Sequence, residues 1–210
     1  MKRLVLMIVP ALICGMVLTS CSSDMENLTD DNFVIMEAAR IKAANVEIDG
    51  KDIVTVKATI SNRLCFENDE CIIVYEVATS KFKNGGFDLI FSANVPDVYL
   101  EPIVVDEGFI ASDIKAKIGY VYFNAFDSAE NRMGNFEIMS GSFWSASYVY
   151  ADRSFTMKGQ TSYGLEVDYS FNKGWNMIYY SYRGAHYYTT QKPLNVDFKC
   201  FFPIPNRCGS

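Results

Sequence analysis

Short apolar runs, rich in β-branched and aromatic residues, recur along most of the chain. Gly, Asn or Asp stands between many of them. Closely spaced runs of this kind, separated by turn residues, are typical of antiparallel sheets rather than of alternating strands and helices. The sequence therefore predicts an all-β fold, an antiparallel β-sandwich. The expected strands are residues 53–60, 71–77, 87–91, 117–126, 143–150, 154–158, 165–171, 175–181, 187–190 and 196–201.

One stretch, residues 33–45 (FVIMEAARIKAAN), is ambiguous. Its Ala, Met and Glu favour a helix, whereas the neighbouring runs favour a strand, and we favour a strand from about Arg40. No linker or repeat interrupts residues 33–202. Residues 33–210 are therefore predicted to form a single β-sandwich domain. The alternative is two small sandwiches that meet near residues 127–135.

The chain begins like an export signal. Lys2 and Arg3 precede an apolar run, residues 4–17, which is shorter than the roughly 20 residues of a transmembrane helix. The run closes on LTSC, residues 18–21, which resembles the lipobox of bacterial lipoproteins. The resemblance implies a signal peptide over residues 1–20 and lipidation of Cys21, whose acyl chains would hold the protein to a membrane. The alternatives are an ordinary signal peptide or an uncleaved anchor.

The following segment, residues 21–32, is polar and acidic and is predicted to be a tether without regular structure. Acidic residues soon after the lipidated cysteine resemble the export signal of Bacteroidetes surface lipoproteins. This resemblance implies an outer-membrane lipoprotein displayed at the cell surface. A plain soluble linker is the alternative interpretation.

Four cysteines remain once Cys14 and Cys21 are set aside, and an even number in an exported protein suggests disulfides. Four cysteines allow three connectivities, and the sequence does not choose among them. We favour Cys65–Cys71 and Cys200–Cys208 because each pair is close in sequence. One or both pairs staying reduced is the alternative.

Four segments resemble small Bacteroidetes lipoproteins of unknown function. They are residues 86–91 (GFDLIF), 98–103 (VYLEPI), 148–153 (YVYADR) and 173–176 (KGWN). The resemblance implies an immunoglobulin-like or transthyretin-like sandwich and provides no catalytic residue. Asp127-Ser128-Ala129 resembles the O-glycosylation acceptor of exported Bacteroidetes proteins, which makes Ser128 a candidate for modification.

The sequence offers little support for catalysis. Its single histidine, His186, has no nucleophile motif to serve, and neither glycine-rich nucleotide motif occurs. No cofactor and no metal site is expected. With a formal net charge of −6 and no basic cluster, no nucleic-acid partner is expected. We therefore expect a protein that is not an enzyme. A hydrolase that uses a pair of acids is the alternative.

Aromatic residues concentrate near the C-terminal end. Residues 143–188 hold 14 of the 30 aromatic residues, and nine of these are Tyr. Tyrosine suits partly wet interfaces because it combines an apolar ring with a polar tip. The candidate ligand-binding residues are Trp144, Tyr148, Tyr150, Tyr180, Tyr182, Tyr187 and Tyr188. The alternative is that these rings fill the core and its rim.

Together these features predict a lipid-anchored envelope protein with a non-catalytic binding role, whose ligand is a glycan or a protein. A scaffold or assembly lipoprotein of the envelope is the second hypothesis.

Overall fold

The computed structural model describes residues 33–48, 51–61, 74–105, 107–141, 143–160, 164–181 and 187–202, all within one compact unit, Asp31–Ser210. The predicted signal peptide, Cys21 and the tether lie outside the described residues. Apart from the 3₁₀ turn η1 (Asp97–Tyr99), the regular structure of the described part is β-strand. Within it, no helix has the length and apolar character needed to cross a membrane.

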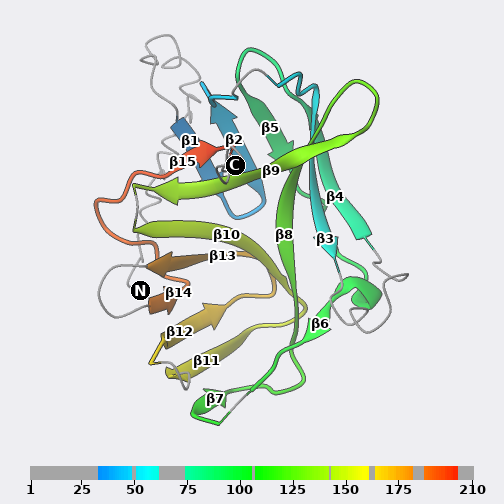
Figure 1. Cartoon of the computed structure of the whole chain (residues 1–210). Helices are drawn as coiled ribbons and strands as arrows, with labels where there is room; N and C mark the ends of the chain where they lie inside the picture. Colours follow the sequence, from blue (N-terminus) through cyan, green and yellow to red (C-terminus); the bar gives the residue numbers. More distant parts are fainter. Residues whose placement is uncertain are drawn as a thin grey trace, which may run out of the picture. The chain divides into compact units, whose positions relative to one another are not determined.

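The strands form two sheets (Figure 1). The smaller sheet is antiparallel, in the order β1 (Phe33–Glu37), β2 (Arg40–Ala44) and β5 (Phe87–Ile90). The larger sheet has the order β4-β3-β8-β9-β10-β13-β14-β12-β11-β7, while β6 pairs with β8 and β15 with β9. Its strands are β3 (Thr55–Ser61), β4 (Val74–Lys81), β6 (Glu101–Pro102), β7 (Phe109–Ala111), β8 (Lys117–Phe126), β9 (Arg132–Ser140), β10 (Trp144–Ala151), β11 (Phe155–Gln160), β12 (Glu166–Phe171), β13 (Gly174–Ser181), β14 (Tyr187–Thr189) and β15 (Lys199–Phe201). The predicted all-β, antiparallel-rich fold is confirmed.

Three details depart from or refine the expected strands. The ambiguous segment is a β1–β2 hairpin in which Glu37 pairs with Arg40, so the expected strand from Arg40 is confirmed and the residues before it are also extended. The sequence did not reveal β9, which continues the larger sheet between β8 and β10. The short strands β6 and β7 were also missed, because each has only two or three residues.

The larger sheet buries side chains on both faces. Successive side chains of a strand point to opposite faces, so β10 presents Tyr148 and Tyr150 to one face and Val149 and Ala151 to the other. The first face shares a buried cluster with the smaller sheet, which includes Ile41, Leu89, Val56, Phe123 and Tyr148. The second face has its own buried cluster, which includes Val149, Phe155, Val167, Phe171 and Ile178.

Strand β8 changes partners along its length, and this opens the sheet. Its C-terminal half pairs with β9, ending at Phe123↔Phe136. Its N-terminal half pairs with β10, from Ile118↔Ala151 to Tyr120↔Val149. Strands β9 and β10 pair with each other only from Ile138↔Ala146 onward. The three strands therefore diverge from a common junction, which is visible in Figure 1 where β8 crosses the ends of β9 and β10.

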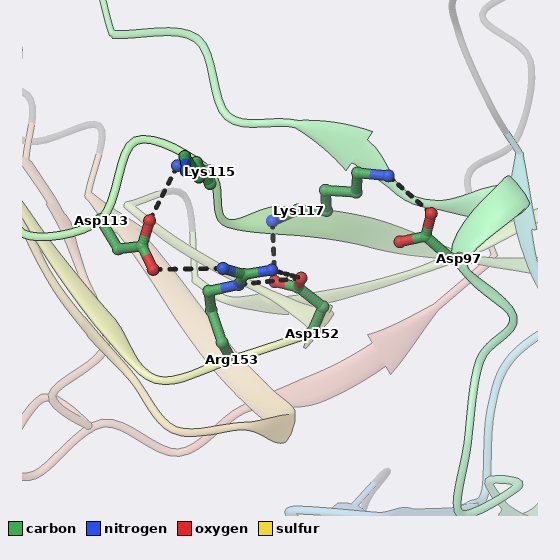
Figure 2. Close-up of polar contacts among 6 residues, drawn as sticks. All are labelled: Asp97, Asp113, Lys115, Lys117, Asp152 and Arg153. Carbon is green, nitrogen blue, oxygen red and sulfur yellow. Dashed lines mark hydrogen bonds and ion pairs between the residues drawn. The ribbon is translucent and has the colours of Figure 1, made fainter.

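The YVYADR segment ends in a structural ion-pair network (Figure 2). The Asp152 carboxylate accepts hydrogen bonds from the Lys117 backbone N–H at 2.8 Å and from Arg153 at 2.9 and 3.0 Å. Arg153 also donates to Asp113 at 3.3 Å. Burial opposes ionisation of Asp152, but these hydrogen bonds outweigh it and lower its pKa. The network fixes the start of β8 to the turn after β10.

Candidate functional site

The second face of the larger sheet is hollowed where β10 carries serines. Ser145 and Ser147 alternate with the buried Ala146 and Tyr148, so both hydroxyls lie on the same face as Val149. Their neighbours on β13 are larger: Ser145 pairs with Tyr180, and Ser147 pairs with Ile178. The two serines therefore form the floor of a hollow, and the larger side chains of β13 form its wall.

Tyrosine rings form the walls over one part of this floor. Tyr180 of β13 and Tyr188 of β14 are directly paired across the two strands, and their rings stack at 4.2 Å with an interplanar angle of 19°. Tyr169 of β12 approaches the Tyr188 ring edge-on at 6.4 Å. We call this part the tyrosine lobe. It encloses about 290 Å³, and its lining residues are Tyr120, Ser145, Ser147, Tyr169, Ile178, Tyr180 and Tyr188.

The hollow continues into the junction where β8, β9 and β10 diverge. This junction lobe has a volume of about 390 Å³ and shares Tyr120, Ser145 and Ser147 with the tyrosine lobe. Polar side chains from β8 and β9 join its lining, among them Tyr122, Asn135 and Glu137. The two lobes together are the groove, which is our candidate site.

The groove is polar but nearly uncharged. Glu137 is the only charged residue among the lining residues of the two lobes, and its side chain is exposed. Burial raises the pKa of Tyr169 well above its ordinary value, and the nearby Tyr120 and Tyr188 add to the effect. Tyr169 is therefore a neutral hydroxyl at neutral pH. The groove offers rings, hydroxyls, one amide and one carboxylate.

Comparisons with protein-family models, with curated proteins and with solved structures gave no match for this chain.

The structure separates the predicted aromatic residues into several groups. Tyr180 and Tyr188 line the groove as neighbours. Tyr148 and Tyr150 are 0% and 5% exposed and belong to the core, which corrects their assignment to a binding face. Both faces of β10 are covered in this region, so alternation alone did not distinguish a core face from an open one.

The remaining predicted aromatic residues lie elsewhere. Trp144 is half-buried and packs against the first core cluster. Tyr187 precedes Tyr188 on β14, so its side chain points to the opposite face and away from the groove. Tyr182 and His186 lie outside the described residues.

Sequence reasoning missed several groove residues. Tyr120 and Tyr122 come from β8, outside the aromatic-rich region, and reach the groove only because Tyr120 pairs with Val149. The serines were visible in the sequence of β10, where a small polar residue twice interrupts an apolar run. That signal is informative only once the neighbouring strands are known.

The other predicted sites divide between described and undescribed residues. Ser128 is exposed in the turn after β8, where the Asp127 carboxylate accepts hydrogen bonds from the backbone N–H groups of Ala129 and Asn131 at 2.9 and 2.8 Å. Cys200 is buried on β15. Cys65, Cys71 and Cys208 lie outside the described residues, so both disulfides stay predictions. Within the described ranges, no group of His, Cys, Asp and Glu is placed to hold a metal ion.

Proposed function

We propose that this chain is a lipid-anchored protein of the bacterial cell envelope, of the small Bacteroidetes surface-lipoprotein type with an immunoglobulin-like or transthyretin-like sandwich. Its role is to bind a ligand in the groove without catalysis. The observation that carries the binding role is the serine floor walled by stacked Tyr180 and Tyr188. Concave sites with aromatic walls and a few convergent polar groups are typical of ligand-binding clefts.

The charge distribution supports the same role. The carboxylates Asp113 and Asp152 flank Arg153 and are not among the lining residues of the groove, and hydrogen bonds lower the pKa of both groups. A general acid needs the opposite shift. In the groove itself, Glu137 is the only acidic residue among the lining residues. A pair of acids, which glycoside hydrolysis requires, is thus not formed by the lining residues.

Membrane attachment is tested through Cys21. The variant Cys21→Ser is expected to move the protein from the membrane fraction to the soluble fraction, because the acyl chains have no attachment point. Proteinase added to intact cells is expected to digest the wild-type protein, because the tether places the domain outside. Retention of Cys21→Ser in the membrane, or protection of the wild type until lysis, contradicts the anchor or the surface location, respectively.

Binding is tested through the stacked tyrosines. On an array of bacterial and host glycans, the purified Cys21→Ser protein is expected to give signals that Tyr180→Ala lowers at least about tenfold, since central aromatic residues dominate binding energies. Tyr187→Ala, on the opposite face of the next strand, is the matched control and is expected to bind like the parent. Equal losses in both variants would place the ligand outside the groove.

A further inference from the structure

The lining of the groove narrows the chemical class of its ligand, and this inference rests on the proposed binding function. The tyrosine lobe presents half-exposed Tyr180 and Tyr188, already stacked on each other at 4.2 Å. Each ring is held by a strand of the sheet, and the stacked pair acts as one platform. Such a platform suits a ligand with flat, weakly polar faces.

Hydroxyl groups surround this platform. Ser145 and Ser147 lie on the floor, and Tyr120 stands on the side of β8. A hydroxyl both donates and accepts hydrogen bonds. The complementary ligand therefore carries many groups that also do both, at the edges of its flat faces. A saccharide ring fits this description, because its C–H faces are apolar and its rim carries hydroxyls.

The charge and the hydroxyls of the groove disfavour two other classes of ligand. A phosphate, sulfate or carboxylate ligand would meet Glu137 and no lining cation, so like charges would repel. A simple organic cation would be attracted by the rings and by Glu137. It would, however, make no use of the serine hydroxyls of the floor, which can both donate and accept hydrogen bonds.

The groove is also elongated and open, unlike a closed pocket. Its two lobes adjoin along β10, and most of their polar lining side chains are half-exposed. A small-molecule site normally encloses its ligand. By contrast, consecutive units of a polymeric ligand can occupy adjoining open lobes. The junction lobe adds Asn135 and Glu137 as hydrogen-bonding groups for the next unit.

We infer that the groove binds a neutral oligosaccharide, with one sugar ring on the Tyr180–Tyr188 platform and the next unit hydrogen-bonded by Glu137. Glu137 accepts hydrogen bonds from sugar hydroxyls and rejects acidic saccharides.

Calorimetry with defined hexasaccharides tests this inference on the Cys21→Ser protein. The neutral probes are the hexamers of β-1,4-glucose, α-1,4-glucose, β-1,4-mannose and β-1,4-xylose. The anionic probe is the hexamer of galacturonate, and the cationic probe is the hexamer of glucosamine. We expect at least one neutral probe to bind, and Tyr180→Ala to weaken it at least about tenfold. Tyr187→Ala is expected to have no effect.

Charge variants of Glu137 provide the second readout. Glu137→Gln keeps the shape and loses the charge, and is expected to weaken the neutral probe about three- to tenfold, since hydrogen bonds to charged groups are the stronger ones. Glu137→Lys is expected to admit the galacturonate hexamer. Glu166→Lys, at an exposed position on β12 outside the groove, is the matched control for added charge and is expected not to admit the galacturonate hexamer.

The outcomes separate the two proposals. Tyr180-dependent binding of only the galacturonate or only the glucosamine hexamer overturns the neutral class and leaves groove binding intact. The same holds if no saccharide binds and an outer-membrane protein extract gives a Tyr180-dependent signal. If no probe and no extract gives a signal that depends on Tyr180, both the ligand class and the proposed function fail.

Discussion

Tyr148→Ala is expected to lower the free energy of unfolding by about 3–5 kcal/mol, the cost of removing a large aromatic side chain from a core. Tyr148 is 0% exposed, and its ring meets Phe91 edge-on at 4.9 Å and Phe123 at 6.0 Å. Its hydroxyl donates a hydrogen bond to the Arg40 carbonyl oxygen at 2.8 Å. Because Arg40 belongs to β2 and Tyr148 to β10, this one side chain joins the two sheets. Urea denaturation measures the effect.

Tyr148→Phe is the matched control, since it keeps the ring and removes only the hydroxyl. It is expected to cost about 1 kcal/mol, the usual net value of a buried hydrogen bond. If Tyr148→Ala and Tyr148→Phe lower the free energy of unfolding equally, the ring contributes nothing to the core, and Tyr148 does not hold the two sheets together.

Ser147→Trp is expected to weaken binding of a neutral hexasaccharide by about 100-fold, equivalent to about 2.7 kcal/mol. Ser147 is part of the floor shared by both lobes, so an indole there occupies the space that the ligand needs. The same substitution is expected to leave the unfolding midpoint nearly unchanged, because the indole enters open space and not a packed core. Calorimetry measures the affinity, and thermal unfolding measures the midpoint.

Ser170→Trp is the control for an added indole. Ser170 is exposed on β12, and it follows Tyr169, so its side chain points to the face opposite the groove. It is expected to bind the hexasaccharide like the parent. Unchanged affinity in Ser147→Trp, with the fold intact, would mean that the ligand does not enter the groove.

Much of the fold could be predicted from local sequence patterns. Strand β8 has the bounds predicted from residues 117–126, because apolar and aromatic residues dominate this segment. Strand β9 was missed because Gly134 and Asn135 stand near its start and resemble a turn. Gly134 has a φ of +149°, and a Cβ at this position would come within 2.8 Å of the Phe202 ring. Close packing by a residue distant in sequence explains this glycine, and no local pattern shows it.

The candidate site was predictable only in part. The excess of tyrosine in residues 143–188 pointed to the region that holds Tyr180 and Tyr188, and the structure pairs these two residues across β13 and β14. It could not separate them from Tyr148 and Tyr150. Where both faces of a strand are buried, as at these two residues, the alternation of side chains does not show which of them reach solvent. The contribution of β8 was beyond reach, since it depends on pairing between strands that other strands separate along the chain.

The pairing of β8 with a strand far from it in sequence also determines when the domain can fold. Strand β3 needs β8 as its neighbour, and Val56 pairs with Ala125 across a long intervening segment. The first core cluster also includes Cys200 and Phe202, near the end of the described residues. Contacts between residues so far apart in sequence close slowly, because the chain entropy of the loop is lost before the contacts form. The N-terminal strands therefore cannot complete their core until the segment through Phe202 has been made, and the two ends of the domain are expected to become protected from hydrogen exchange together.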